Sequence, residues 1–362
     1  MKDMDRLFPP GQAGFLEKHF QRKQDFWKPN LVSLMAKMRA YKSLRGAVGH
    51  YFTSDELKDA YSLQSLYIGG APFKTPGIYS LLPYAEHEYG VWMLKGGYGR
   101  LPEILREELE DRGVKVHLNT EVTSIEIVQG RVKGLKANGK REDFDAVIYN
   151  GEFPGLPALL EGVTIPSRKP YAPSSGCVLI YAGVKKRWTD GMTHQFFLPD
   201  SLHTSLKEVF DKRTIPADPA FYIFNPVSLD EAAAPPGESV LYFLIPVPDA
   251  KGVDWEREAP ALADLVLKEA EKRGFPGLLE HLRWQKIRTP MDAERDGLYG
   301  GGSFGIAPIL SQSGVFRPQP KPYAAISGLY AAGASVHPGG GVPIVMQGAK
   351  LAVDQLIKEM SI

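Results

Sequence analysis

The sequence predicts an α/β fold with α+β insertions, in which a second domain carries an antiparallel sheet. Three patterns predict it: a C-terminal strand, glycine loop and helix; a β-meander around residue 130; and separated aromatic-rich strands between residues 177 and 247. Helices that alternate with buried strands are typical of α/β domains, whereas separated strands joined by loops are typical of antiparallel sheets. A chain of 362 residues is long enough for two cores.

The first sixty residues have a helical pattern. Spacings of three and four separate Leu31, Leu34, Met35 and Met38, as on one face of a helix. The same segment is basic and lacks acidic residues between Phe26 and Ser54; its charges are Lys28, Lys37, Arg39, Lys42 and Arg45. Two interpretations remain open: a helix that lies on an anionic membrane surface, or a solvated basic face over a stripe of core residues.

A helix over Leu101–Arg112 and a β-meander are expected next. The turns Gln129-Gly130 and Asn138-Gly139 separate strands of the meander, and Asn-Gly is a strong hairpin signal. Its last strand is largely apolar, as expected inside a parallel sheet. The predicted strands are Val114–Leu118, Glu121–Val128, Arg131–Ala137 and Phe144–Asn150.

The second sheet follows a proline-rich linker. The single cysteine, Cys177, begins its first strand and excludes an internal disulfide; it is a buried core residue or, alternatively, a reactive thiol. A helix over Ala259–Arg273 comes after the sheet. The predicted strands are Cys177–Gly183, Gln195–Leu198, Phe221–Phe224 and Ser239–Val247.

The C-terminal segment is the most informative part of the chain. A buried strand over Gly328–Ala332 leads into three consecutive glycines, 339 to 341, and then into a helix that Pro343 opens. Glycine permits positive φ and close approach, and the first turn of a helix presents unpaired N–H groups to an anionic ligand. This pattern predicts a loop that closes on a flat, phosphate-bearing cofactor; an ordinary strand–loop–helix crossover is the alternative.

Other classes of chemistry lack their usual patterns. The net charge of +1 indicates no nucleic-acid partner, and no segment reaches the ~18–20 apolar residues of a membrane span. Scattered histidines and one cysteine predict no metal site, and no nucleophile elbow or phosphate-binding P-loop occurs. A cofactor-borne reaction remains, for which the protein supplies position and electrostatics.

Three blocks resemble the bacterial-type carotenoid desaturases, the phytoene and diapophytoene desaturases of the FAD-dependent amine oxidase group. They are the segment of Ser62–Leu105 that begins SLQSLYIGGAPFKTPGIYS, then GGGSFGIAPILSQSGVFRP (Gly300–Pro318), and last GLYAAGASVHPGGGVPIVMQGAKLA, which starts at Gly328. Their order matches the family over nearly the whole chain. The similarity is greatest to the desaturases of C30 (diapo) carotenoids, while C30 and C40 substrates both remain open.

The resemblance implies an interleaved two-domain FAD-dependent oxidoreductase. It implies a helical, membrane-facing region (1–90), an FAD-domain part with the meander (91–160), an antiparallel substrate domain (161–288) and a C-terminal FAD-domain part (289–362). It places the backbone of Glu121 and Val122 near the adenine. The flavin-side residues that it implies are Gly333, Ala334, Ser335, His337, Pro338, Gly339, Gly340, Gly341, Val342, Pro343 and Ile344.

The implied reaction removes a hydride and a proton from adjacent carbons of a polyene. Oxidation of terminal methyl groups of diapocarotenoids, and carotenoid isomerisation, are alternatives within the family. Such a substrate is expected to bind through buried apolar area. The protein is expected in the cytoplasm, bound peripherally to the inner face of the membrane. The segment Tyr67–Tyr84 and several aromatic residues of the second sheet are candidate walls or, individually, ordinary core residues: Phe196, Phe197, Tyr222, Phe224, Tyr242 and Phe243.

His337 is the one titratable side chain of the C-terminal motif, and it could relay a proton or make a fixed hydrogen bond that shapes the loop. No general base can be named, since Glu88 and Glu152 are only guesses. The first sixty residues also lack the strand–G-x-G-x-x-G–helix unit that grips a dinucleotide. Gly300, Gly302 and Gly305 match that motif by spacing alone. The chain is thus expected to be a shortened desaturase or half of a split enzyme, with a non-catalytic lipid-binding or partner polypeptide as the alternative. Its expected partners include a second copy of itself or a missing N-terminal half.

Overall fold

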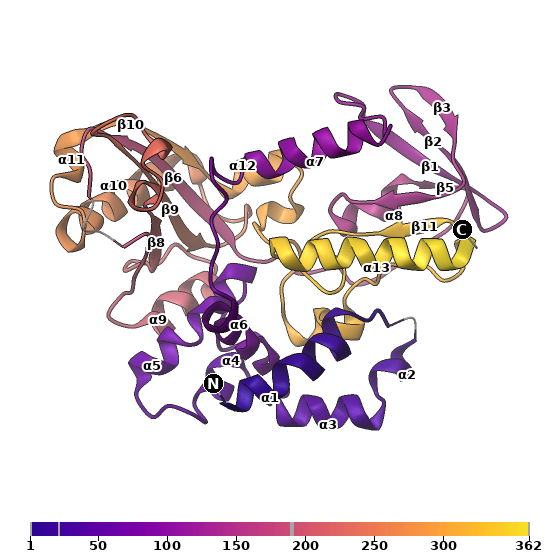
Figure 1. The fold of residues 1–362 in the computed structure, drawn as a ribbon, viewed down its shortest axis with the longest axis horizontal. Helices are drawn as coiled ribbons and strands as arrows, with labels where there is room; N and C mark the ends of the chain where they lie inside the picture. Colours follow the sequence, from indigo (N-terminus) through magenta and orange to yellow (C-terminus); the bar gives the residue numbers. More distant parts are fainter. Residues whose placement is uncertain (1, 21, 189–191, 361–362) are drawn as a thin grey trace. The chain divides into compact units, whose positions relative to one another are not determined.

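A computed structural model describes residues 2–20, 22–188 and 192–360. The chain divides into two compact units (Figure 1). Unit 1 comprises Met1–Gly90, Asn119–Ser174 and Gly297–Ile362, and unit 2 comprises Val91–Leu118 and Ser175–Asp296. Both units are therefore built from discontinuous segments. No helix within the described ranges is long and apolar enough to cross a bilayer.

Unit 1 combines a helical N-terminal part with two small sheets. Its helices are α1 (Lys2–Gly11), α2 (Lys23–Phe26), α3 (Pro29–Lys37), α4 (Leu44–Val48), α5 (Asp55–Ala60), α6 (Leu81–Tyr89), α8 (Leu156–Leu159) and α13 (Val342–Met360). Its strands are β1 (Val122–Val128), β2 (Arg131–Ala137), β3 (Lys140–Asp143), β4 (Val147–Tyr149), β5 (Leu160–Glu161) and β11 (Leu329–Ala331).

The predicted meander is confirmed in its centre. One sheet has the order β3-β2-β1-β5, and a second consists of the parallel pair β11-β4. Both residues of the Gln129-Gly130 turn and both of the Asn138-Gly139 turn have positive φ, which two-residue hairpins with a type I′ turn require. The core beneath these strands is apolar and includes Ile125, Ile127, Val132, Leu156 and Leu329.

The strand predicted over Val114–Leu118 is wrong. The segment is irregular, and its alternate residues Val114, Val116 and Leu118 are exposed. Its period-2 pattern is that of a strand, but no described strand pairs with it, and a ladder needs a neighbour that supplies its hydrogen bonds. The strand expected over Phe144–Asn150 is shorter, since β4 covers only Val147–Tyr149.

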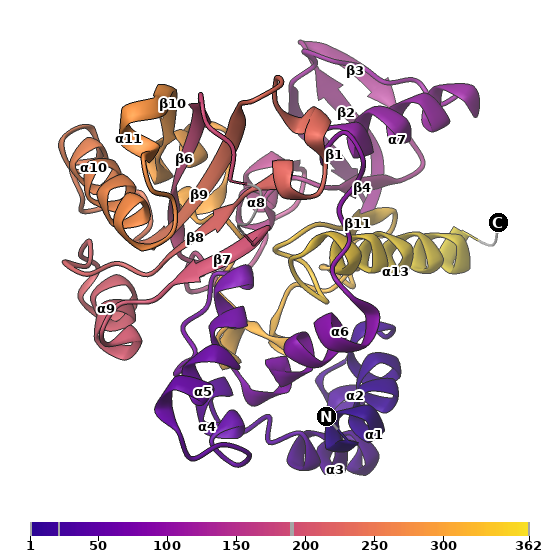
Figure 2. The same ribbon diagram turned by 60° about the vertical axis from the view of Figure 1, so that its left-hand side comes forward.

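The N-terminal helices pack around a small aromatic core. Phe15, Phe20, Phe26, Leu31 and Met38 are buried together, and Figure 2 shows α1, α2 and α3 gathered in one group. The stripe predicted from helical spacing thus faces the protein core. On the outer side, the Trp27, Val32 and Tyr41 side chains are exposed.

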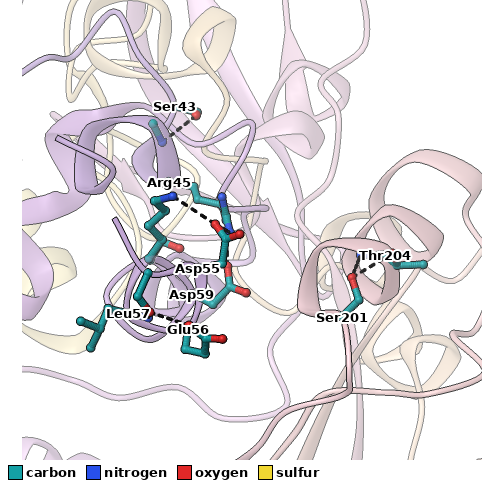
Figure 3. A network of polar contacts seen from close by, with 12 residues as sticks. Ser43, Arg45, Asp55, Glu56, Leu57, Asp59, Ser201 and Thr204 are labelled. Atoms are coloured by element: carbon teal, nitrogen blue, oxygen red, sulfur yellow. Dashed lines mark hydrogen bonds and ion pairs between the residues drawn. The ribbon is translucent and has the colours of Figure 1, made fainter. Parts of the chain in front are cut away.

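Part of the basic N-terminal charge is neutralised within unit 1. The Arg45 guanidinium lies 2.8 Å from Asp59 Oδ1 and 3.0 Å from Asp55 Oδ1 (Figure 3). Ser43 caps the N-terminus of α4 by accepting a hydrogen bond from the Gly46 N–H. Arg45 therefore joins α4 to α5 and contributes little to a basic surface.

Unit 2 is built on one five-stranded antiparallel sheet, which confirms the predicted antiparallel sheet and adds one strand, β10, that was not predicted. Its strands, in the order β10-β6-β9-β8-β7, are β6 (Gly176–Val184), β7 (His194–Phe197), β8 (Phe221–Phe224), β9 (Ser239–Val247) and β10 (Leu282–Arg288). Its helices are α7 (Arg100–Asp111), α9 (Leu202–Lys207), α10 (Trp255–Arg273), α11 (Leu278–His281) and α12 (Pro290–Arg295).

The two faces of this sheet differ in what covers them. One face packs against α10 (Figure 2), and alternate residues such as Ile180, Phe243 and Ile245 are fully buried there. Phe197 and Phe243, considered above as candidate walls of a substrate site, belong to this core. Cys177, near the start of β6, is also buried. Aromatic rings in mutual contact occupy the other face: Tyr181, His194, Phe196, Tyr222, Phe224 and Tyr242.

Candidate functional site

The candidate cofactor loop lies between β11 and α13 of unit 1. The predicted strand is confirmed as β11, which pairs in parallel with β4 and is fully buried, and α13 runs alongside it (Figure 1). The loop then passes from the interior to the surface: Ser335, His337 and Gly339 are buried, whereas Gly341 and the first two residues of α13 are exposed. The N-terminus of α13 therefore opens outward.

Gly339 and Gly341 adopt backbone conformations that favour glycine, with φ of +143° and +102°. The space beside them is open, because a Cβ added at either position would meet no atom of the described residues nearer than 3.9 Å. The first helical hydrogen bond that reaches back to the loop joins the Val345 N–H to the Gly341 carbonyl at 2.9 Å. The earlier amides of α13 have no partner within the helix, and Pro343 carries no N–H.

Ser335 fixes the buried half of the loop. Its hydroxyl donates to Glu152 Oε2 at 2.5 Å and accepts from the Ile306 N–H at 3.1 Å. The Ser335 side chain is 2 % exposed, and it connects segments 183 residues apart. Glu152, named above only as a guess for a base, therefore serves here as the acceptor of a hydroxyl.

The three sequence blocks meet at this loop. A Cβ on Gly69, in the first block, would lie 2.6 Å from the Phe304 ring of the second block, and one on Gly70 would lie 2.6 Å from Pro308. A Cβ on Gly305, in the second block, would lie 2.7 Å from Ser335 Oγ of the third. Glycine at these positions lets three distant segments pack in direct contact.

His337 is a buried, neutral side chain that shapes the loop. Its Nε2 donates to the Lys18 carbonyl at 2.8 Å, and its ring contacts Phe20 edge-on. Burial lowers the pKa of His337 to about 4, so the imidazole is uncharged near neutral pH. These features favour the fixed hydrogen bond over the proton relay and connect the loop to the N-terminal aromatic core.

Arg317 is the functional candidate that the sequence reasoning missed. Its guanidinium donates to the carbonyls of Gln312 (3.3 Å) and Ala334, and Nε has no partner among the described residues. A Cβ on Gly339 would lie 3.9 Å from both Nε and Cζ of Arg317. Its position in the second block was visible in the sequence, but its burial beside Gly339 depends on the fold.

The remaining predicted site residues lie apart from this network. Glu121 precedes β1, where its N–H donates to Asn138 Oδ1 at 3.2 Å and its carbonyl accepts from the Asn138 N–H; Val122 begins β1. No hydrogen bond in the described chain joins either residue to the glycine loop. Gly302 packs against Ser174, whose carbonyl oxygen would be 2.9 Å from an added Cβ, so the spacing match to a dinucleotide motif reflects packing.

The loop fits the isoalloxazine side of a flavin. It offers open glycines, outward-pointing amides at the start of a 19-residue helix and a buried cation with an unpartnered nitrogen. Gly339, Gly340, Gly341, Val342 and Ile344 would hold the group through backbone contacts. Among the described residues no cluster of three or more His, Cys, Asp or Glu side chains could hold a metal ion.

Comparison with known proteins decides the family. The model of the flavin containing amine oxidoreductases matches residues 12–357. This chain belongs to that family. It is therefore an oxidoreductase with FAD as its cofactor. The three blocks and the open loop of this chain lie within the matched region.

Two relatives resemble it over 99 % of its length. A 4,4'-diapolycopen-4-al dehydrogenase of Metabacillus indicus is 44 % identical over 359 residues, with 72 % of that protein covered. A 4,4'-diapophytoene desaturase (4,4'-diaponeurosporene-forming) of Staphylococcus aureus (strain MRSA252) is 31 % identical over 383 residues, with 75 % of that protein covered. Each similarity thus covers nearly the whole of this chain.

Solved structures agree on the fold. An oxidoreductase from Methanosarcina mazei has a TM-score of 0.61 at 16 % identity, over 97 % of this chain and 75 % of that one. The cyclohexylamine oxidase of Brevibacterium oxydans IH-35A has a TM-score of 0.55 at 12 % identity, over 100 % and 75 %. The predicted α/β fold of the amine oxidase type is confirmed.

Proposed function

We propose that this flavin amine oxidoreductase desaturates a linear carotenoid precursor such as 4,4'-diapophytoene. The observation that carries the proposal is similarity over 99 % of the chain to two proteins named for diapocarotenoid oxidation, together with a flavin-side loop that is open. Desaturation takes a hydride from an allylic carbon and a proton from the adjacent carbon, and a C=C bond forms between them. Bound FAD supplies the acceptor for the hydride and its electron pair.

The residues of the loop prepare this step by position and charge. The glycines 339 and 341 let the backbone approach the flat ring, because no Cβ fills the open side. The N-terminus of α13 stabilises negative charge that develops there. Ser335, held by Glu152, and His337, held by Lys18, keep the loop in one conformation, which preorganises the site before substrate binds.

The aromatic face of the unit 2 sheet is the surface we propose for the polyene. Phe196, Tyr222, Phe224 and Tyr242 lie on the face away from α10, and their rings contact one another or His194. A hydrocarbon without polar groups binds through buried apolar area, at about 25 cal/mol per Å². Phe197 and Phe243 are not part of this surface, since they lie in the core.

Oxidation of a terminal group of a diapocarotenoid is the second candidate. The 44 % identity to the diapolycopenal dehydrogenase exceeds the 31 % identity to the desaturase. Desaturation and terminal oxidation differ in their products: the first lengthens the conjugated system and removes two hydrogens, whereas oxidation of an aldehyde to an acid adds one oxygen.

The experiment is incubation of the purified, FAD-loaded protein with 4,4'-diapophytoene and, separately, with a diapolycopenal, in lipid vesicles with an added electron acceptor. Desaturation predicts new visible absorption from the first substrate and a mass lower by two hydrogens for each step. A change confined to the aldehyde, with one oxygen gained, would replace the proposal by the second candidate. No product from either substrate would refute both.

We further propose that the protein acts in the cytoplasm, bound peripherally to the inner face of the membrane. Trp27, which is 54 % exposed, lies beside exposed Lys28, and Val32 and Lys37 are exposed on the next helix, α3. An apolar ring beside basic side chains suits an anionic lipid surface. Trp27→Ala should weaken sedimentation with phosphatidylglycerol vesicles several-fold, whereas Trp284→Ala, at a similarly exposed tryptophan, should not. Equal binding by both variants would refute this contact.

A further inference from the structure

Arg317 is a buried cation without a counter-ion in the part of the chain that the structure describes. Its side chain is 4 % exposed, and it forms no ion pair with any described carboxylate. Within the described ranges its hydrogen bonds go to backbone carbonyls only: those of Gln312, Ile306 and Ala334. Burial lowers the pKa of Arg317, but the group starts so high that it keeps its proton.

A charge buried in this way is costly unless another charge compensates it. Glu152 is the carboxylate whose charge acts on Arg317, but it already accepts a hydrogen bond from the Ser335 hydroxyl. Carbonyl oxygens satisfy part of the guanidinium, yet Nε remains unpartnered among the described residues. The electrostatics of unit 1 alone therefore leave Arg317 incompletely compensated.

The position of the unpartnered nitrogen relates this charge to the glycine loop. Nε and Cζ are the atoms of Arg317 that a Cβ on Gly339 would approach, at 3.9 Å. Another hydrogen bond of the same guanidinium reaches the carbonyl of Ala334, within the same loop. The positive end of α13 begins three residues after Gly339. Two independent sources of positive potential therefore converge on residues 339–341.

We propose that Arg317 provides the fixed positive charge that stabilises reduced flavin over the glycine loop. Reduction places negative charge at the N1–C2=O edge of the isoalloxazine ring, and the sum of Arg317 and the α13 N-terminus favours that form over the neutral oxidised form. The inference rests on the proposed flavin site and names the residue that sets its reduction potential. The same charge favours addition of sulfite to flavin, because the adduct carries negative charge at the same edge.

A purely structural role is the competing explanation. Arg317 could act only as a clamp on the carbonyls of residues 306, 312 and 334. Loss of a clamp would lower stability and flavin affinity, but it would not change the relative affinity for reduced and oxidised flavin. The reduction potential and the sulfite affinity therefore separate the two roles without any measurement of turnover.

The test compares the FAD-loaded wild type with Arg317→Gln, Arg317→Lys and the control Arg168→Gln. Arg168 is an exposed arginine of the same unit that contacts the Phe316 carbonyl and the Tyr171 ring, so solvent screens its charge. We expect Arg317→Gln to weaken the binding of reduced flavin, relative to that of oxidised flavin, by at least tenfold. This corresponds to a fall of about 30 mV in the two-electron reduction potential. Sulfite affinity should fall at least tenfold as well, while Arg317→Lys and Arg168→Gln stay within threefold of wild type.

Each outcome is decisive. An unchanged potential and unchanged sulfite affinity in Arg317→Gln would overturn this inference but leave the proposed function standing. A wild-type chain that holds no flavin would overturn the proposed function and this inference together. If Arg317→Gln fails to fold, the wild type alone still tests the charge: sulfite must bind its flavin at least a hundredfold more tightly than it binds FAD free in solution, and equal affinity would refute the role.

Discussion

Two glycine-rich segments of unit 1 look alike in sequence and differ in space. Gly300, Gly302 and Gly305 match the spacing of a dinucleotide motif, yet a Cβ at Gly302 or Gly305 would come within 2.9 Å of protein atoms. Gly339 and Gly341 match no such spacing, and their Cβ positions are open to 3.9 Å. Glycine in the first segment lets chain pack against chain, whereas glycine in the second leaves open space, where we propose that the flavin lies.

The largest effect is expected where the packing glycine is replaced. Gly305→Ala would place Cβ 2.7 Å from Ser335 Oγ, at a φ of +78°. Overpacking and the left-handed backbone together should lower the free energy of unfolding by about 3 kcal/mol. Urea denaturation of the purified wild type and variant measures this loss of unfolding free energy. A loss below about 1 kcal/mol would show that this segment is not tightly packed.

Removal of the atom against which Gly305 packs should have a smaller effect. Ser335→Ala deletes the acceptor of the buried Ile306 N–H and the donor to Glu152, at a cost of about 2 kcal/mol. The same change should relieve the collision in Gly305→Ala, so the double variant should be more stable than the sum of the two losses predicts. Strict additivity in a double-mutant cycle would contradict the contact.

Acid should weaken the closed part of the loop through His337. Its pKa is about 4 in the folded protein and near 6.5 when unfolded. Because the pKa is lower in the folded state, the unfolded chain takes up the proton first as the pH falls. The contribution of neutral His337 to the free energy of unfolding is therefore complete above pH 6.5 and falls as the pH drops toward 4. Between pH 7 and pH 5.5 the wild type should lose about 1 kcal/mol that His337→Gln does not lose. Parallel pH profiles of unfolding for the two proteins would exclude a buried neutral imidazole.

The smallest effect is expected at the glycine between the two open positions. A Cβ on Gly340 would lie 3.5 Å from the Phe304 carbonyl, an ordinary contact that points into the protein. Gly340→Ala should therefore change the free energy of unfolding by less than about 0.5 kcal/mol. A large loss in urea denaturation would mean that the loop is closed on that side.

Local signals predicted much of this fold. Runs rich in Val, Ile, Tyr and Phe identified four strands of the unit 2 sheet, and the Asn138-Gly139 turn identified the meander, because both patterns depend on neighbours in sequence. Val114–Leu118 also has a strand-like pattern but no described partner strand. For Phe197 and Phe243 the sequence left a substrate wall and the core as alternatives, and the structure places both in the core, because the position of α10 decides which face is buried.

The site was predictable in its backbone and not in its buried polar contacts. The strand, glycines and helix of residues 328–360 were visible from sequence. The bond between Ser335 and Glu152 joins residues 183 positions apart, and Arg317 depends on three carbonyls gathered by the fold. The roles assigned to Glu121 and Val122 near the adenine remain predictions.

The most direct test of the central claim is a flavin titration of the wild type, Gly340→Ala and Gly341→Ala, with FAD and with FMN, followed by absorbance and fluorescence. Gly341 has a φ of +102° and an open Cβ position, so a methyl group there would enter the space that the flavin needs. We predict that Gly341→Ala binds both flavins at least tenfold more weakly than the wild type, while Gly340→Ala stays within twofold. Equal binding by all three proteins, a loss confined to Gly340→Ala, or no binding by the wild type would contradict the assignment of residues 339–341 to the flavin.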